Sequence, residues 1–239
     1  MKKPLGIKSY GSIPHLPGSR LGGGDHHISE GEAQMLTRRG SKCHDWWNHH
    51  DGTVIVTEKV DGSCMSIAKV DGLIVTLGRA GHRAESSRFE QHKMFADWVM
   101  REPDRFHPLC DRERVAGEWL SQAHGTRYEI YNNPFIAFDI FDEFNTRAPY
   151  LMFLEMCQRM LLPTARLIHI GGPISIKEVR KKLEPSGHGA IDPVEGAVWK
   201  LEEEGHFLFN AKWVRPDKED GKYLPEVSGK EAIWNWRPL

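Results

Sequence analysis

The chain has 239 residues, of which 39% are apolar and 27% charged, and its formal net charge is −1 when histidine is neutral. No apolar run approaches the ~20 residues that cross a bilayer, so the composition excludes a membrane helix and is that of an ordinary soluble protein. The near-zero charge also excludes a general attraction for phosphate. A nucleic-acid binder of this composition would need its Lys and Arg gathered on one face.

The start of the chain and its cysteines bear on where the protein works. The two lysines at positions 2 and 3 are not followed by an apolar stretch, so we expect no secretory signal. The cysteines at positions 43, 64, 110 and 157 have no Cys-x-x-Cys spacing, which argues against a zinc ribbon and a disulfide framework. We therefore expect an intracellular protein with reduced thiols.

Residues 1–50 are expected to form a loop-rich N-terminal extension, because Pro and Gly recur through its first half. The histidines there lack the spacing of a zinc finger or of a helical metal site, so a surface loop is favoured over a metal site. A second option is that Ser19, Arg20 and the nearby glycine amides form a phosphate-binding surface.

Helices are predicted from capping boxes and proline stops. Capping boxes begin at Ser29, Ser87 and Ser175. Residues 43–51, which are rich in Trp and His, receive no assignment. The predicted helices cover residues 29–37, 87–102, 149–162 and 175–183.

Strands are predicted from β-branched and alternating apolar stretches. Asp71-Gly72 predicts a two-residue hairpin turn. The first strand ends at Lys59, which is therefore expected to open an antiparallel meander. Beyond residue 216 we expect only a short tail, so that residues 1–239 form a single domain with no separate C-terminal domain. The predicted strands cover residues 53–58, 63–70, 73–77, 114–120, 135–141, 194–201 and 206–214.

Lys59 is followed at once by Val60, Asp61 and Gly62. A lysine on a rigid strand end beside a carboxylate and a glycine is a candidate covalent nucleophile, because the amine is held in one place and the glycine leaves room for a bound group. Taken alone, the tetrapeptide is a weak signal that is more typical of a solvated lysine before an Asp-Gly turn.

Several apolar strands each carry a charged residue in an apolar setting. One such residue is usually an edge position or half of a core ion pair, but a series on successive strands indicates a shared polar groove lined by a sheet. The residues concerned are Lys59, Glu118, Asp139, Glu195, Lys200 and Lys212.

Taken together and in order, these motifs strongly resemble those of the covalent nucleotidyltransferases, the superfamily of polynucleotide ligases and capping enzymes. The chain is most similar to the RNA ligase 2 type of phage and bacterial RNA ligases, in which a small residue such as Ser63 follows the glycine; DNA ligases and capping enzymes typically carry Arg two positions after it. The resemblance covers roughly residues 50–215 and rests on Lys59-Val60-Asp61-Gly62, Arg79, Gly117-Glu118-Trp119, Phe138-Asp139, Glu195-Gly196-Ala197-Val198-Trp199-Lys200 and Lys212.

The resemblance implies an α+β fold of antiparallel sheets with flanking helices that form a nucleotide-binding cleft, the ATP-grasp-like adenylyltransferase fold. It implies that Lys59 attacks the α-phosphorus of ATP and becomes a lysyl-AMP, with Lys212 against the α-phosphate oxygens. Glu195, with Asp61 nearby, would hold Mg²⁺ or Mn²⁺, mainly through water. The other implied nucleotide-binding residues are Glu58 and Gly62 beside the nucleophile, Arg79 and Glu118 at the ribose, Phe138 on adenine and Lys200 at a phosphate.

Plainer interpretations of some of these residues stay open on the sequence alone. Phe138 could be an ordinary core residue, Glu118 and Asp139 could be ion-paired core carboxylates, and Lys200 could be a strand-edge charge. The last motif also departs from the family pattern. It has Asn210 where the family usually carries a first lysine, although an Asn side chain can still donate a hydrogen bond.

Lys59 must be neutral to attack phosphorus, yet a free lysine with a pKa near 10.4 is almost wholly protonated at pH 7. Either a nearby cation, such as Lys212, Arg79 or the metal, lowers the pKa of Lys59, or the amine loses its proton when ATP binds.

The resemblance implies an ATP-dependent RNA ligase that joins RNA ends carrying a 5′-phosphate and a 3′-hydroxyl. We expect a monomer in the cytoplasm of a bacterial cell or a phage-infected host, with no membrane partner. The alternatives are a ligase for DNA or RNA-DNA hybrid ends and a non-catalytic nucleotide- or RNA-binding module. The candidates for holding RNA ends are Arg20, His26 and His27 in the N-terminal loops and the basic run Arg79, Arg83 and Arg88.

Overall fold

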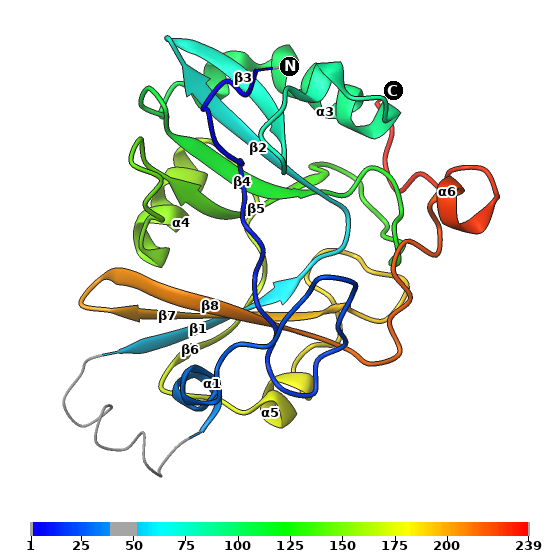
Figure 1. Ribbon diagram of the computed structural model, residues 1–239. Helices are drawn as coiled ribbons and strands as arrows, with labels where there is room; N and C mark the ends of the chain where they lie inside the picture. Colours follow the sequence, from blue (N-terminus) through cyan, green and yellow to red (C-terminus); the bar gives the residue numbers. More distant parts are fainter. Residues whose placement is uncertain (1, 39–51, 239) are drawn as a thin grey trace.

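The computed structural model describes residues 2–38 and 52–238. Two four-stranded antiparallel sheets, each with its own helices, form a lower and an upper lobe (Figure 1). The lower sheet has the order β6-β1-β7-β8 and the upper sheet the order β3-β2-β4-β5. The predicted α+β class with antiparallel sheets is therefore confirmed.

The lower lobe contains strands β1 (Thr53–Lys59), β6 (Leu167–Gly171), β7 (Gly196–Glu203) and β8 (His206–Val214), with helices α1 (Glu30–Thr37) and α5 (Ile176–Arg180). The upper lobe contains β2 (Ser63–Val70), β3 (Leu73–Gly78), β4 (Arg114–Trp119), β5 (Phe135–Phe141), α3 (Glu90–Arg101), α4 (Tyr150–Arg159) and the short 3₁₀ helices η1 (Ala84–Ser86) and η2 (Pro103–Phe106). A last short helix, α6 (Pro225–Ser228), lies in the C-terminal segment.

Strand β1 is apolar on both faces because each face packs on a different core. Val54 and Val56 pack with α1, α5 and the lower sheet, whereas Ile55 belongs to the core of the upper lobe. Alternate side chains of a strand point to opposite faces, so an unbroken β-branched run suits a strand buried on both sides. Because β1 is packed on both faces, the end of the strand at which Lys59 lies is held in a fixed position.

The chain leaves the lower sheet at Lys59 and enters the upper sheet at Ser63. The expectation that Lys59 opens a meander is wrong, because both edges of β1 are already paired, with β6 and with β7. The crossing runs close to the upper lobe: a Cβ on Gly62 would overlap the carbonyl oxygen of Trp119. Lys59 therefore lies at the junction of the two lobes.

Most predicted elements are present, with two corrections. The capping boxes at Ser29 and Ser175 are confirmed, and the Asp71-Gly72 turn has the two positive φ angles, 52° and 77°, of a type I′ hairpin. The capping box at Ser87 is wrong: α3 begins at Glu90, and the Ser87 hydroxyl instead bonds to His92 Nδ1 and accepts the Phe89 N–H. Strand β6 was not predicted.

The segments at both ends pack against the lobes. Residues 2–28 run from the upper to the lower lobe (Figure 1): the Ser9 and Tyr10 amides donate to the Arg79 carbonyl, and the Leu16 amide donates to the Lys212 carbonyl. The unassigned residues 43–51 lie outside the described residues. At the other end, the ring of Trp236 meets that of Trp119 at 5.5 Å. Within the described ranges, no helix is long and apolar enough to cross a membrane.

Substitution of Gly196 tests the pairing of β7 with β1 and β8, which fixes the ends of these strands. It lies opposite both Lys59 and Val214, and a Cβ there would overlap the Trp213 carbonyl oxygen, so Gly196→Ala is expected to lower the free energy of unfolding by about 2 kcal/mol or more. Urea unfolding measures this change. The matched control is Gly31→Ala in α1, where a Cβ meets open space and is expected to be neutral or to stabilise by up to about 1 kcal/mol. Equal stabilities of the two variants would contradict the packing.

Candidate active site

A cleft between the two sheets brings most of the predicted site residues together. It is lined from the lower sheet by β1, β7 and β8, from the upper sheet by β2, β4 and β5, and at one side by the N-terminal segment. A second hollow continues from Lys59 along the upper lobe and includes Asp61 and Gly62. The predicted residues that line the cleft itself are Glu58, Lys59, Arg79, Glu118, Phe138, Lys200 and Lys212.

Lys59 is fixed by the pairing of β1 with β7. Since Lys59 lies opposite Gly196, the preceding residue, Glu195, comes beside it, and Lys59 Nζ donates to Glu195 Oε2 at 2.5 Å. The lysine side chain is 22% exposed and that of Glu195 only 7%. The structure thus joins two residues that the sequence separates widely.

The pKa of Lys59 contradicts one of the two explanations, predicted from the sequence, of how its amine becomes neutral. Burial lowers the pKa of Lys59, but the nearby carboxylates of Glu195, Glu118 and Asp61 outweigh it and hold the pKa well above the ordinary lysine value. The expectation that Lys212 or Arg79 lowers this pKa is therefore wrong for the nucleotide-free protein. Lys59 is an ammonium there, and the other expectation, that the amine loses its proton when ATP binds, stays a prediction.

Glu118 faces Lys59 from the upper sheet. Its Oε1 accepts the Gly62 N–H at 3.1 Å, so it holds the crossing segment to β4. Burial raises the pKa of Glu118 to about 7, although Lys59 opposes the rise. This carboxyl therefore changes charge near neutral pH.

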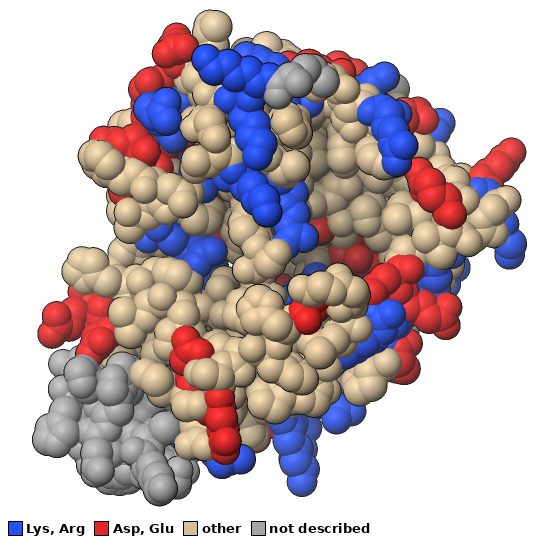
Figure 2. Space-filling view, viewed as in Figure 1, with Lys and Arg blue, Asp and Glu red and all other residues tan. Residues whose placement is uncertain are grey.

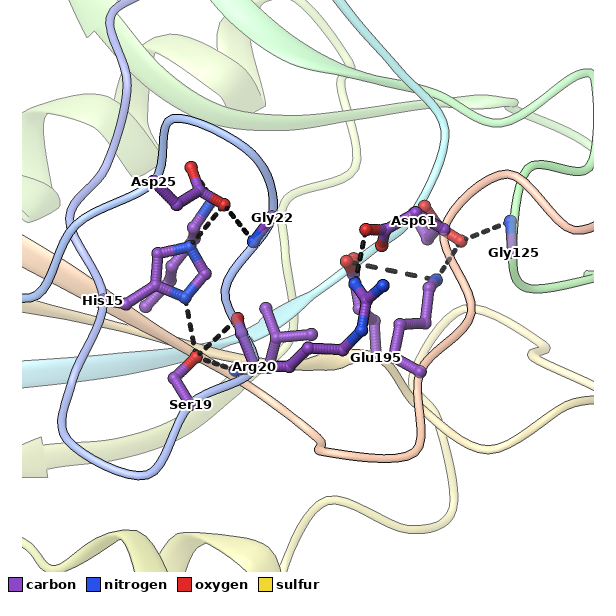
Figure 3. A network of polar contacts seen from close by, with 12 residues as sticks. His15, Ser19, Arg20, Gly22, Asp25, Asp61, Gly125 and Glu195 are labelled. Atoms are coloured by element: carbon purple, nitrogen blue, oxygen red, sulfur yellow. Dashed lines mark hydrogen bonds and ion pairs between the residues drawn. The ribbon is translucent and has the colours of Figure 1, made fainter. Parts of the chain in front are cut away.

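Asp61 lies on the crossing segment and is bound from two directions. Its Oδ2 accepts the Gly125 N–H at 2.8 Å (Figure 3). The same oxygen also pairs with the ammonium of Lys218. Burial raises the pKa of Asp61, but Lys218 and Lys59 hold it below the ordinary value. Lys218 was missed by sequence reasoning, because it lies in the segment expected to be only a polar tail.

Another group of charges occupies the deep end of the cleft beside Phe138. Lys200 Nζ pairs with Asp139 Oδ1 at 2.5 Å and donates to the Phe138 carbonyl at 2.6 Å. Arg147 also pairs with Asp139, at 3.1 Å. Asp139 is therefore an ion-paired core carboxylate, as one sequence interpretation held. A phosphate contact by Lys200 stays a prediction, and its ammonium is already paired.

Phe138 is half-buried and meets a residue that the sequence did not indicate. The ring of Tyr10, from the N-terminal segment, packs edge-on against Phe138 at 4.9 Å, and its hydroxyl donates to Asp139 Oδ2 at 2.5 Å. No local signal marks Tyr10, which lies in a loop far upstream of Phe138. An adenine contact by Phe138 stays a prediction, with Tyr10 as a further wall of that part of the cleft.

The carboxylate of Glu58 is satisfied within the protein. It pairs with Arg166 at 2.7 Å and accepts hydrogen bonds from the Ser186 hydroxyl at 2.5 Å and the Gly187 N–H at 2.9 Å. Successive side chains of a strand point to opposite faces, so this carboxylate lies away from Lys59. A contact between Glu58 and a nucleotide would therefore use its main chain.

Lys212 reaches the cleft from β8, and its Nζ lies 3.9 Å from Asp25 Oδ1. Burial, and then Lys59, lower the pKa of Lys212, which fits a cation that awaits an anionic ligand. Asn210 lies two residues earlier on the same face of β8. It is buried, and its Nδ2 has no hydrogen-bond partner among the described residues. The predicted hydrogen bond from Asn210 to a phosphate is thus untested.

The N-terminal loop is anchored to β8 rather than open as a phosphate surface. Ser19 Oγ accepts the Val214 N–H at 2.9 Å and bonds to His15 Nδ1 at 2.7 Å, while His15 Nε2 lies 3.0 Å from Asp25 (Figure 3). Arg20 pairs with Asp220. The charge of Arg20 is therefore already matched, whereas His26 and His27 are exposed.

The second hollow offers a cationic surface next to Lys59. Arg79, Arg83 and Arg88 are all exposed, and the first two line this hollow together with Ser63 and His92. Figure 2 shows Lys and Arg side chains in a band that descends the upper lobe toward the groove between the lobes. A protein of near-zero net charge thus has the local concentration of cations that nucleic-acid binding requires.

Asp61 and Glu195 fit a divalent metal that keeps most of its own water. Among residues 2–38 and 52–238 there is no group of three or more His, Cys, Asp or Glu side chains placed to hold a metal. However, the two carboxylates both approach the ammonium of Lys218, so a cation is held between them. Mg²⁺ is commonly bound by one or two carboxylates together with substrate phosphates and water.

Glu118 makes stability depend on pH. Because its pKa is about 7 in the fold and near 4.3 in an unfolded chain, the folded protein keeps a proton that the unfolded chain has released, and stability falls as pH rises from about 4 to 7. Glu118→Gln removes this penalty. At pH 8 we expect the variant to unfold with a free energy roughly 1 to 3 kcal/mol above that of the unmodified protein, and at pH 5 we expect a smaller gap.

Urea unfolding at the two pH values measures this gap, and Glu143→Gln at an exposed position is the matched control. A Glu118→Gln gap that is no larger at pH 8 than at pH 5 would contradict the buried, protonated Glu118.

Comparisons with solved structures agree with the two-lobed fold. The chain is similar to an RNA ligase of Naegleria gruberi with PPi, at 17% identity and a TM-score of 0.52, over 94% of this chain and 64% of that chain. A mutant of the same ligase with ATP and Mn gives 13% identity and a TM-score of 0.50, over 93% and 64%. An archaeal ATP-dependent RNA ligase shares 19% identity with a TM-score of 0.46, over 75% and 47%.

The chain thus spans about half to two thirds of the length of the structures it matches. No curated protein matches it. A family model described as RNA ligase matches residues 52–214, which is more than half of the chain and includes both lobes and Lys59. The chain therefore belongs to the RNA ligase family.

Proposed function

We propose that the protein is an ATP-dependent RNA ligase that joins a 5′-phosphate end to a 3′-hydroxyl end through a lysyl-AMP on Lys59. The observation that carries this proposal is the position of Lys59: a strand end inside a cleft, 2.5 Å from Glu195, with Lys212 of the same sheet also lining the cleft. A solvated turn lysine would have none of these neighbours. The membership in the RNA ligase family supports the reaction class.

In the first step, Lys59 Nζ attacks the α-phosphorus of ATP, which is consumed as a substrate. A P–N bond forms while the bond from that phosphorus to the pyrophosphate oxygen breaks. The ammonium loses two protons in all, and Glu195 Oε2 is the acceptor in direct contact with it. Lys212 balances the charge on the phosphate oxygens. When bound by Asp61 and Glu195 through water, Mg²⁺ or Mn²⁺ supplies further positive charge there.

In the second step, an oxygen of the 5′-phosphate of a nucleic-acid end displaces Lys59 from the AMP phosphorus, so the P–N bond breaks as a P–O bond forms, and the lysine regains its two protons. In the third step, the 3′-hydroxyl attacks that phosphate and AMP leaves. All the steps are displacements at phosphorus, for which positioning and charge supply most of the catalysis. We assign the 5′-phosphate to Arg79 and Arg83, which line the second hollow next to Lys59.

We propose that the ends that the protein joins are RNA ends. The family description and the Naegleria gruberi ligase favour RNA, and the mutant structure of that ligase with ATP and Mn favours ATP and a divalent metal. We further propose that the protein's partner is RNA, that it is a monomer, and that it works in the cytoplasm of a bacterial or phage-infected cell.

Sealing of nicked duplexes tests the reaction and the substrate together. With ATP and Mg²⁺, the protein is expected to seal nicks with RNA at both ends. Lys59→Ala is expected to lose this activity by more than about a thousandfold, because no other group can carry the AMP. Lys230→Ala, at an exposed lysine, is the control. Sealing of all-DNA nicks alone would reject the RNA assignment, and no sealing of any nick would favour a non-catalytic binding module.

Strands that already carry AMP on the 5′-phosphate separate the third step from the first two. Because that step uses no P–N bond, folded Lys59→Ala is expected to seal such strands without ATP at a rate within about tenfold of the unmodified protein. Gel analysis of labelled strands measures the rate. Loss of this activity as well would show that Lys59 does more than carry AMP.

A further inference from the structure

Lys218 is a buried lysine that lies beyond residue 214, where the match to the family model ends. Its side chain is 1% exposed. The ammonium pairs with Asp61 Oδ2 and lies 3.9 Å from Glu195 Oε1, on the opposite oxygen of the carboxylate that contacts Lys59. Lys218 thus stands between the two carboxylates that fit a divalent metal.

The surroundings of Lys218 are shaped to receive it. Its Nζ also donates to the Thr126 hydroxyl, at 3.3 Å. A Cβ on Gly125 would lie 2.6 Å from Lys218 Cε and 2.7 Å from Nζ, so only glycine leaves room for the lysine at this point. The Gly125 amide donates to the same oxygen of Asp61 (Figure 3). The C-terminal segment and this loop together hold Asp61 in place.

The balance of charge around Asp61 indicates the role of Lys218. Three carboxylates meet here, those of Asp61, Glu118 and Glu195, and the ammonium groups of Lys59 and Lys218 partly balance them. Without Lys218, Lys59 would be the one ammonium among the described residues that is ion-paired with this group of mostly shielded carboxylates, with Lys212 acting on Glu195 from further away. Buried charges of one sign are costly and draw in a counterion.

We propose that Lys218 is the resident counter-cation of the Asp61–Glu195 pair, a positioning residue that keeps this pair from binding a divalent metal until the nucleotide brings one. The inference rests on the proposed function in assigning the pair to the metal. It goes further by giving the C-terminal segment a role in the order of binding. ATP carries its metal on its own phosphates, so the protein need not hold the metal beforehand.

The test measures Mn²⁺ binding at pH 8 without nucleotide. The electron paramagnetic resonance signal of free Mn²⁺ reports how much of the metal is unbound. The unmodified protein is expected to bind Mn²⁺ no more tightly than Asp61→Asn does, because Lys218 occupies the pair. Lys218→Met is expected to bind Mn²⁺ at least about tenfold more tightly, owing to the net negative charge it leaves. Adding Asp61→Asn to Lys218→Met is expected to remove that gain.

Lys230→Met, at an exposed lysine of the same segment, is the matched control and is expected to behave as the unmodified protein. Circular dichroism establishes that each variant is folded. A folded Lys218→Met that gains no affinity would overturn the inference. A tenfold loss of Mn²⁺ affinity when Asp61→Asn is introduced alone would also overturn it. This second measurement does not depend on whether Lys218→Met folds. Neither readout requires lysyl-AMP, so failure of the ligase proposal would be seen separately.

Discussion

The antiparallel register of β1 against β7 is the constraint on which the site depends. It sets Lys59 opposite Gly196 and so brings Glu195 into contact with the lysine. Burying two charges costs desolvation free energy, which is offset only when the groups are paired in good geometry. The cleft meets this condition by surrounding the Lys59 ammonium with carboxylates. The lysine is thereby fixed in place and kept protonated in the nucleotide-free protein.

The same short segment joins the two lobes. Directly after Lys59, Val60 is buried against Leu120 and Tyr128 of the upper lobe. The Asp61 amide donates to the Tyr128 hydroxyl at 2.9 Å, and the Gly62 amide donates to Glu118. Lys59, the proposed nucleophile, is thus tied to a rigid strand on one side and to the opposite lobe on the other. Such support from both sides holds a reacting group within the narrow limits that in-line displacement needs.

The sequence predicted seven of the eight strands that the described residues form, two of the three capping boxes and most of the residues that meet in the cleft, because local periodicity and motif order determine these. It could not predict contacts made by segments with no signal of their own: Tyr10 comes from an irregular loop and Lys218 from a polar tail. The prediction of a meander was wrong because strand pairing depends on which edges of β1 are free. The prediction of a lowered pKa for Lys59 was wrong because that pKa depends on how many carboxylates surround the lysine. Strand β6 pairs at an edge of its sheet and lacks a buried run.

The central claim is that Lys59, and no other group, becomes covalently attached to AMP. Its most direct test is to incubate the protein with ATP and Mg²⁺, stop the reaction under conditions that keep phosphoramidates intact, and locate AMP by peptide mass mapping. The account predicts AMP on the single peptide that contains Lys59, with fragment ions that place it on that lysine. AMP on another residue, or no AMP on a folded protein that binds ATP, would contradict the account.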